Sequence, residues 1–526
     1  MGIMQKYNTL NMPYEIWNIS KKTAMASKGV VVAQEIEAAR VGALMLEAGG
    51  NAVDAAIATA FALCVTEPWM SGLGGGGFMQ VYMAETQTVQ LIDFSMIAPA
   101  ELVQSDYILT GETGDDLFGW PAVEHDTNFH GAKAISVPGA VAGYALANEV
   151  FGRKCWQQLI QPAVELAKRG HRKTWWTTLN VAAEAKLLAL YSQSKLDWLP
   201  DGQVPTVSST PNDDYLNLDK LALTLELLSI HGPEYFYLGE LAENIVNDIG
   251  EAGGRLSRLD LKNYSARILD PLTVSRGSTV YNLVPEYSAG PTFLDALNRL
   301  PKFDKGTPAP EHHRSICEAL IEAYKTRLDT MGHAADADDH SCTTHINTLD
   351  SEGNIVVMTT TLLSRFGSRF VLPTSGVLMN NGINWFDPRP NRPNSIAAGQ
   401  RPLSNMCPII AIKDGQPSSG LGASGGRKIL PAVFQIAVYM NDFGMDLATA
   451  INYPRIDVST TDVIVYDDRF DRQTRTLLDG LATTRPWAPT TFPSIYAVPS
   501  GVQITEDGKL VGVAHPLSPL AAAVEA

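Results

Sequence analysis

Hydrophobic and polar residues alternate along two neighbouring stretches in the second half of the chain. The first stretch runs from Thr343 to Leu349, a polar turn containing Gly353 follows, and the second runs from Ile355 to Thr361. Alternation with a period of two is typical of half-buried β-strands, and a short turn with glycine joins two such strands in a hairpin. The sequence therefore predicts a central β-hairpin over residues 343–361.

Before this hairpin the pattern changes to the spacing of helices. Residues 53–64 are apolar on every side, which predicts a buried helix. Asn51 is placed to cap its first turn, and Asp54 completes a capping box. The other elements expected in this part of the chain are helices at 38–48, 139–151, 221–230 and 241–252 and strands at 78–83 and 88–94.

After the hairpin, two predicted strands at 407–412 and 419–423 lead through Ser424-Gly425-Gly426 into a predicted helix at 428–440. Backbone N–H groups at a glycine turn before a helix are free to bind an anion. Gly425 and Gly426 are therefore candidates for an oxyanion hole, which stabilises the negative charge that develops during acyl transfer.

The same turn supports a second interpretation. Residues 422–426 match G-x-S-x-G, the pattern of a nucleophile elbow, with Ser424 as the nucleophile. The remaining triad members would be Asp457 or Asp467 and His515. An elbow requires a parallel α/β sheet, whereas the strands before Ser424 read as antiparallel. A serine hydrolase therefore stays an alternative.

The composition is that of a folded, soluble protein, with 45% hydrophobic and 18% charged residues among 526. The formal net charge of −16 argues against nucleic acid as a partner, because phosphates would be repelled. The uncharged run 55–66 is too short for a membrane span, which needs about 20 residues, and residues 1–30 contain no apolar signal core. Five scattered cysteines fit a reducing compartment. We expect a cytoplasmic protein without a membrane or nucleic-acid partner.

Two stretches resemble cofactor or metal motifs but lack the required context. Residues 71–77 contain G-x-G-x-x-G, yet they follow a helix and open a strand, the reverse of a dinucleotide site. A run rich in aspartate and histidine lacks the glycine and glutamate of a calcium loop and the H-E-x-x-H of a zinc helix, so it reads as a solvated connector. We expect no organic cofactor and no metal. The residues of this run are His333, Asp336, Asp338, Asp339 and His340.

Thr343 becomes a candidate nucleophile if the peptide bond before it is cut. It would then carry both a hydroxyl and a free α-amine, whose pKa is about 7.7–8.0. Near neutral pH this amine can take the proton of the hydroxyl and act as an internal general base. The solvated connector upstream is what a processing site requires.

Several segments combine into one pattern: residues 49–56, residues 71–78, Thr343-Thr344-His345, Phe366-Gly367-Ser368, Arg401-Pro402-Leu403-Ser404 and Ser424-Gly425-Gly426. Their order and spacing over about residues 30–460 resemble the γ-glutamyltranspeptidase family of N-terminal nucleophile hydrolases. The resemblance implies an α+β fold, a four-layer αββα sandwich. It also implies self-cleavage of one precursor into a large subunit, 1–342, and a small subunit, 343–526, which stay associated.

The resemblance also assigns catalytic roles. Thr343 would be the nucleophile released by cleavage of the bond between Cys342 and Thr343. Thr361 would supply the hydroxyl that orients it, and the amides of Gly425 and Gly426 would form the oxyanion hole.

The sequence departs from the family where members that act on glutathione hold the γ-glutamyl group. Ser95 stands in place of the Arg that binds the α-carboxylate, and Trp385 in place of the Asp that binds the α-ammonium. Leu363 and Gly382 align with supporting polar residues. These losses remove the charge-assisted contacts that would offset desolvation of a zwitterion. We therefore expect glutathione to be a poor substrate and the pocket to be more apolar.

Two further features belong to this expected pocket. Of the paired serines that follow Arg-Pro-Leu in the family, only Ser404 remains, and its neighbour is Asn405. Arg365 and Arg369 flank residues 366–368, where they either receive an acyl group that ends in an anion or are simply exposed at a strand edge.

We therefore expect an autoprocessing threonine amidohydrolase or acyltransferase that forms an acyl-enzyme on Thr343. Its substrate would be a small-molecule amide or acyl compound other than glutathione. The alternatives are a hydrolase that uses Ser424 and an uncleaved, non-catalytic relative of the family.

Overall fold

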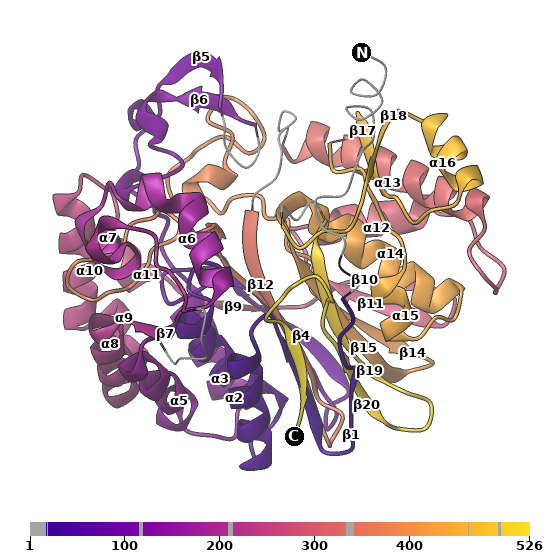
Figure 1. Ribbon diagram of the computed structural model, residues 1–526, viewed down its shortest axis with the longest axis horizontal. Helices are drawn as coiled ribbons and strands as arrows, with labels where there is room; N and C mark the ends of the chain where they lie inside the picture. Colours follow the sequence, from indigo (N-terminus) through magenta and orange to yellow (C-terminus); the bar gives the residue numbers. More distant parts are fainter. Residues whose placement is uncertain are drawn as a thin grey trace.

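The computed structural model describes residues 17, 19–114, 119–208, 214–332, 341–460, 462–492 and 496–526, with only the backbone of Ser341 and Cys342. Two seven-stranded antiparallel sheets lie face to face at its centre, and helices cover the outer face of each (Figure 1). These are the four layers, αββα, that the resemblance implied, and the predicted fold class is confirmed.

Sheet 1 contains the predicted central hairpin in its middle. The hairpin begins two residues before Thr343, so the strand is continuous through the expected cleavage position. Its strand order is β21 (Ala522–Glu525), β2 (Gly29–Ala33), β12 (Ser341–Asp350), β13 (Ile355–Ser364), β3 (Gly76–Met83), β4 (Thr88–Phe94) and β9 (Arg267–Leu269).

Sheet 2 contains the strand that leads into the glycine turn. Its order is β1 (Ala24–Ala26), β20 (Leu510–Val513), β19 (Val498–Ile504), β15 (Gln416–Ser424), β14 (Ile409–Lys413), β11 (Thr279–Leu283) and β10 (Leu272–Arg276). The other strands form small sheets: β5 (Leu109–Thr113) with β6 (Pro121–Val123), β7 (His171–Arg172) with β8 (Tyr215–Leu216), and β16 (Ile456–Asp457) with β17 (Val463–Asp467) and β18 (Thr483–Trp487).

The helices fall into two groups, on the left and right of the sheets in Figure 1. The group on the side of sheet 1 comprises α2 (Ile36–Glu47), α3 (Ala52–Thr66), α4 (Ala140–Phe151), α5 (Trp156–Arg169), α6 (Trp175–Leu188), α7 (Ser192–Trp198), α8 (Asp219–His231), α9 (Glu234–Tyr237), α10 (Glu240–Glu251) and α11 (Arg258–Asn263). The group on the side of sheet 2 comprises α12 (Gly290–Arg299), α13 (Pro310–Thr330), α14 (Ile429–Asp442), α15 (Leu447–Asn452) and α16 (Arg472–Asp479). None of the helices in the described ranges has the length and apolar character needed to cross a membrane.

The buried helix predicted over 53–64 is α3, and every one of its residues is buried. The side chain of Asn51 accepts from the amides of Val53 and Asp54, and the Asp54 carboxylate accepts from the Asn51 amide, so the predicted capping box is confirmed. Helix α2 begins two residues earlier than predicted, because the Glu35 side chain accepts from the Ala38 amide and caps it.

The strand periodicity of sheet 1 separates two hydrophobic cores, one toward the helices and one between the sheets. In β2, Val31 packs toward the helices, while Val30 and Val32 pack between the two sheets. In the hairpin, Ile346 and Met358 face the helices. Leu349, Ile355 and Val357 pack between the sheets, so odd-numbered residues in the regular part of the hairpin face sheet 2, and Thr343 lies two residues before His345 in this alternation.

Strand β15 has glycine where it faces the hairpin. A Cβ atom at Gly420 would lie 2.5 Å from Cγ1 of Val357, and one at Gly422 would lie 2.0 Å from Cε1 of His345. Real Cβ contacts are not this short, so the two sheets approach as closely as they do only because these side chains are absent.

We expect Gly422→Ala to destabilise the protein by more than about 2 kcal/mol, because the added methyl group overlaps a buried ring held on both sides. Thermal unfolding measures the effect. Gly250→Ala is the matched control: Gly250 lies in α10 with nothing within 4 Å of the added carbon, so the same substitution should stabilise by up to about 1 kcal/mol. Equal melting temperatures for the two variants would contradict the close packing at Gly422.

Candidate active site

The Thr343 hydroxyl donates to the Thr361 hydroxyl over 3.2 Å, and both residues are buried. An irregularity in the hairpin makes this possible. Between the pairs Cys342↔Leu363 and Thr344↔Thr360, β12 has one residue and β13 has two. The extra residue forms a β-bulge, which re-aims side chains locally.

Leu363 completes the bulge with an unusual backbone conformation. Its φ is 82°, in the left-handed region that costs a residue with a Cβ about 1–2 kcal/mol. In this conformation its amide donates to Thr361 Oγ1 over 2.8 Å. The Thr361 hydroxyl is thus oriented by the backbone amide of Leu363, and it also accepts a hydrogen bond from the Thr343 hydroxyl.

Gln34 joins three elements at this position. From the junction of β2 and α2, its amide donates to the Ser424 hydroxyl over 2.5 Å and to the Thr343 carbonyl over 3.4 Å. The side chains of Gln34 and Ser424 are both buried. The end of β15 is therefore tied to the strand that contains Thr343.

Gly425 and Gly426 follow Ser424 in a turn with φ values of 128° and 54°. Both values fall where residues other than glycine are strained. The turn continues as a short 3-10 helix, Gly426–Lys428, which contacts β12, and then as α14. The N–H groups of Gly425 and Gly426 have no hydrogen-bond partner among the described residues. Free amide donors close to a nucleophile are what an oxyanion hole requires.

His345 lies on the same strand as Thr343 but has both ring nitrogens engaged. Nδ1 is 2.8 Å from Thr359 Oγ1 and Nε2 is 3.0 Å from Asn347 Oδ1. Because the Asn347 amide nitrogen donates to Ser500, its oxygen accepts from His345, which places the ring proton on Nε2. Burial lowers the pKa of His345 to about 4. His345 is thus a neutral positioning residue rather than a base for Thr343.

On the opposite face of β12, Thr344 contacts a buried acid. Its hydroxyl donates to Glu67 over 3.2 Å. Burial and, to a lesser extent, the neighbouring charge of Glu35 raise the pKa of Glu67 to about 8. Burial likewise raises the pKa of Glu35 to about 7. Thr344 of β12 therefore contacts a carboxyl group, that of Glu67, which is mostly protonated at neutral pH.

Next to the bulge lies an apolar cluster in which the structure brings together two residues predicted to line the pocket. Leu363 and Trp385 are both buried there. Met96, which follows Ser95, belongs to the same cluster. Its full membership is Phe78, Leu91, Met96, Trp120, Val284, Leu363, Trp385 and Met406.

A cavity of about 30 Å³ opens beside this cluster. Trp120, Trp385 and Asn405 contribute to its wall, and so does Arg427, the residue directly after Gly426. The cavity therefore lies between the apolar cluster and the glycine turn.

Ser404 and Asn405 are held in place by Arg327 of α13. The Arg327 guanidinium donates to the Ser404 carbonyl over 2.7 Å and to the Asn405 side chain over 3.0 Å. It also donates to the Ser288 carbonyl over 2.6 Å. These contacts fix the loop, and the Ser404 hydroxyl accepts from the amide of Met406.

Ser95 and Gly382 have structural contacts. The Ser95 amide donates to Asp93, whose carboxylate is bound by Arg267 and Arg401. The Gly382 amide donates to Asn380 Oδ1 over 2.8 Å. Gly382 opens the 3-10 turn Gly382–Trp385 and so contributes to the pocket mainly by placing Trp385.

The two arginines beside residues 366–368 differ from each other. Arg369 is only 2% exposed, pairs with Glu184 and lies over the Phe129 ring, so the expectation of a residue exposed at a strand edge is wrong for it. Its positive charge is balanced by Glu184, which lies on helix α6. Arg365 is partly exposed, with its guanidinium 5.9 Å from the Phe492 ring.

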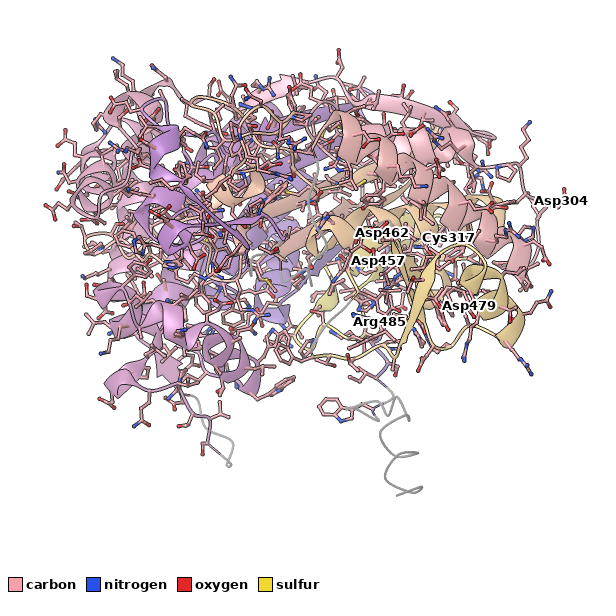
Figure 2. The ribbon with its side chains drawn as sticks, turned by 90° about the horizontal axis from the view of Figure 1, so that it is seen from above. Asp304, Cys317, Asp457, Asp462, Asp479 and Arg485 are labelled. Carbon is pink, nitrogen blue, oxygen red and sulfur yellow. The ribbon has the colours of Figure 1, made fainter. Side chains whose placement is uncertain are left out.

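The alternative triad is not assembled among the described residues. His515 Nε2 faces Arg455 over 3.1 Å, and Asp467 is bound by Arg469. Asp457 accepts from Ser459 and lies in the same small sheet as Arg485, on the far side from sheet 1 (Figure 2). The strands before Ser424 are antiparallel, as predicted.

No group of three histidine, cysteine or acidic residues within the described ranges is arranged to hold a metal ion. The aspartate and histidine run at 333–340 lies outside those ranges.

Residues 38–338 and 327–524 match the gamma-glutamyltranspeptidase family, which is most of the chain. The chain belongs to this family. The predicted family and the prediction of an enzyme of the hydrolase and transferase class are thereby confirmed.

Relatives within the family are similar over most of their length. The Glutathione hydrolase proenzyme of Bacillus subtilis (strain 168) is 28% identical, covering 95% of this chain and 92% of the relative. The Acylase ACY 1 proenzyme of Pseudomonas sp. (strain V22) is 32% identical, covering 83% of each. The crystal structure of cephalosporin acylase from Bacillus halodurans has the same fold, with a TM-score of 0.83, 22% identity and coverage of 98% and 99%.

Two residues of this site were not singled out from the sequence. Gln34 is the first polar residue after the apolar strand Gly29–Ala33, and Glu67 follows the apolar helix α3. A polar residue at the end of a fully buried element is a usable signal, because such a group needs a partner. The sequence alone does not reveal that the partner of Glu67 is Thr344 on β12 and that the partner of Gln34 is Ser424 on β15.

We expect Glu67→Gln to change the pH dependence of stability. The Glu67 carboxyl group has a pKa of about 4.5 in the unfolded chain and about 8 in the folded protein. Between these two values the unfolded chain loses its proton more readily, so the free energy of unfolding falls as the pH rises. The Glu67→Gln variant has no ionisable group at this position and does not lose this stability. Its melting temperature should therefore match that of the wild type near pH 4.5 and exceed it at pH 8. Glu47→Gln, at an exposed position of α2, is the control and should leave the slope unchanged. Parallel curves for Glu67→Gln and wild type would contradict the assignment.

Proposed function

We propose that this protein is an autoprocessing threonine amidohydrolase or acyltransferase whose nucleophile is Thr343. The observation that carries the proposal is the buried contact between the hydroxyls of Thr343 and Thr361, next to the unoccupied amide donors of Gly425 and Gly426. The proenzyme relatives support a precursor that yields two associated subunits.

Processing would begin at the bond between Cys342 and Thr343. The Thr343 hydroxyl oxygen attacks the Cys342 carbonyl carbon, the C–N bond breaks, and an ester forms while the nitrogen takes up a proton. Water then hydrolyses the ester, which leaves a carboxylate on Cys342 and a free α-amine and hydroxyl on Thr343. The proposed subunits are residues 1–342 and 343–526.

In turnover, the α-amine of Thr343 takes the hydroxyl proton as the oxygen attacks the substrate amide carbon. The amides of Gly425 and Gly426 stabilise the oxyanion, and the amine then returns the proton to the leaving nitrogen. Water or an amine acceptor releases the acyl group from the threonine ester. Thr361, held by the Leu363 amide, orients the nucleophile.

We expect the purified wild-type protein to run as two bands on a denaturing gel, with the smaller band beginning at Thr343. Thr343→Ala should remain one chain without activity, because it lacks the attacking oxygen. Thr343→Ser is the matched control and should still split, since it keeps the hydroxyl. N-terminal sequencing of the smaller band gives the cleavage position.

Ser424→Ala separates this proposal from the serine alternative, and it should still split and retain turnover. Activity in an intact wild-type chain, lost in Ser424→Ala, would favour the serine hydrolase. An intact and inactive wild-type chain would favour the non-catalytic relative.

The proposed substrate has an acyl group with an apolar or aromatic body. Leu363, Trp385 and Met406 surround the position beside the bulge, and the neighbouring cavity is walled by Trp120 and Trp385. Ser95 offers no positive charge where the family pattern has an Arg. Desolvating a zwitterion in such surroundings has no compensating charge pair.

We expect phenylacetyl-p-nitroanilide to be cleaved with a kcat/KM about a hundredfold or more above that of γ-glutamyl-p-nitroanilide. Each lost charged hydrogen bond costs about 1.5–3 kcal/mol, and about 1.4 kcal/mol corresponds to a factor of ten. The processed enzyme is compared on both anilides.

Ser95→Arg combined with Trp385→Asp should raise the activity on the γ-glutamyl anilide. Ser95→Ala with Trp385→Phe is the matched control and should not. Efficient wild-type cleavage of the γ-glutamyl anilide, without improvement in the double variant, would show that this pocket recognises glutamate by other contacts.

A further inference from the structure

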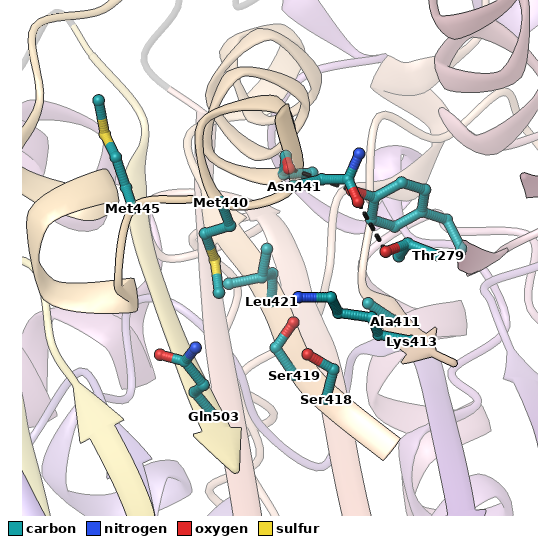
Figure 3. A pocket seen from close by; sticks show the side chains of 12 residues that line it. Thr279, Ala411, Lys413, Ser418, Ser419, Leu421, Met440, Asn441, Met445 and Gln503 are labelled. Atoms are coloured by element: carbon teal, nitrogen blue, oxygen red, sulfur yellow. Dashed lines mark hydrogen bonds between the residues drawn. The ribbon is translucent and has the colours of Figure 1, made fainter. Parts of the chain in front are cut away.

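A second cavity, of about 60 Å³, lies on the outer face of sheet 2 beneath α14 (Figure 3). Its walls come from β11, β14, β15, β19 and α14, and Thr343 and the glycine turn are not part of them. Strand β15 contributes Ser419 to this cavity and ends at Ser424 in the candidate active site, and the two side chains point to opposite faces of the sheet. The cavity is thus separate from the chemistry proposed above.

Ser419 is a buried polar group that faces this cavity without a partner. The residue is 3% exposed, and its hydroxyl makes no hydrogen bond to any described residue. Buried hydroxyls in folded proteins are almost always bonded to protein, water or a ligand. Figure 3 shows the Ser419 hydroxyl directed into the cavity, with that of Ser418 beside it.

Two further donors converge on the same space. Lys413, an exposed residue, extends its side chain over the cavity (Figure 3). No carboxylate within the described part of the chain pairs with it. Gln503 accepts from the Leu447 amide through Oε1 over 3.0 Å, so its NH₂ group is turned toward the cavity.

The lining contains no acidic side chain. The acceptor oxygen of Asn441 is already used, since it accepts from the Thr279 hydroxyl over 2.6 Å. Leu421, Met440 and Met445 contribute apolar surface to the wall. A lysine, the Ser419 hydroxyl and the Gln503 NH₂ group without a carboxylate in the lining favour an anion over a cation or a neutral amine.

The size of the cavity limits the ligand. A water molecule occupies about 30 Å³ of the liquid and needs about 10–15 Å³ of probe space. A cavity of about 60 Å³ therefore holds an oxyanion of about five heavy atoms. Inorganic phosphate, sulfate and a short carboxylate such as acetate share this chemistry.

We propose that the cavity beneath α14 binds a small oxyanion through Lys413, Ser419 and Gln503. The Ser419 hydroxyl and the Gln503 NH₂ group donate to the oxygen atoms of the anion, and the Lys413 amino group balances its charge. This site is independent of processing at Thr343.

The test uses the full chain and inorganic phosphate, followed by phosphorus NMR line broadening at about pH 7.5 and constant ionic strength. We expect saturable broadening below about 10 mM phosphate, with a matching rise in melting temperature as bound ligand stabilises the fold. Lys413→Met should weaken binding by about tenfold or more. Ser419→Ala, which removes only one oxygen atom, should also weaken phosphate binding. In the absence of phosphate, the melting temperature of this variant should equal that of the wild type.

Lys302→Met is the matched control, because Lys302 is exposed and lies outside the cavity. It should bind phosphate as the wild type does. Competition by sulfate identifies an inorganic oxyanion, and competition by acetate but not sulfate identifies a carboxylate. Absence of saturable broadening, or equal broadening in wild type, Lys413→Met and Ser419→Ala, would overturn the proposal.

Discussion

The contact between His345 and Gly422 sets the distance between the two sheets at the candidate site. The imidazole occupies the space that a Cβ at position 422 would fill. Thr343 lies two residues before this ring, and Ser424 lies two residues after this glycine. The same contact therefore fixes the hydroxyl of Thr343 relative to the turn at Gly425 and Gly426.

The polar groups around this contact are arranged so that few carry charge. His345 is neutral because burial lowers its pKa, and its two ring nitrogens serve Thr359 and Asn347. Glu67, on the opposite face of β12, has its pKa raised by burial. Under the proposed mechanism, a free amine on the buried Thr343 would lose hydration, which favours the neutral amine that a general base requires.

The proposed acyl pocket and the hydroxyl pair of Thr343 and Thr361 are built from the same bulge. Leu363 donates its amide to Thr361 and buries its side chain in the apolar cluster with Trp385. A change of side chain at position 363 can therefore alter what the pocket accepts while the backbone contact to Thr361 is kept. This separation agrees with a family whose members include both glutathione hydrolase and acylase proenzymes.

The sequence by itself determined the elements and the chemistry that local pattern encodes. The hairpin at 343–361, the buried helix with its capping box and the glycine turn after Ser424 all depend on neighbours within a few residues, and each lies where it was predicted. The family pattern added the αββα layers and the expected roles of Thr343 and Thr361.

The tertiary structure alone decided which distant groups meet. Gln34 reaches Ser424 across 390 positions of the chain, and Glu67 reaches Thr344 across 277. Arg369, for which exposure at a strand edge was one of two interpretations, is buried against Glu184 instead. Such pairings depend on the register of two sheets and on the side chains missing at Gly420 and Gly422. Periodicity tells which face a residue occupies but not what lies opposite to it.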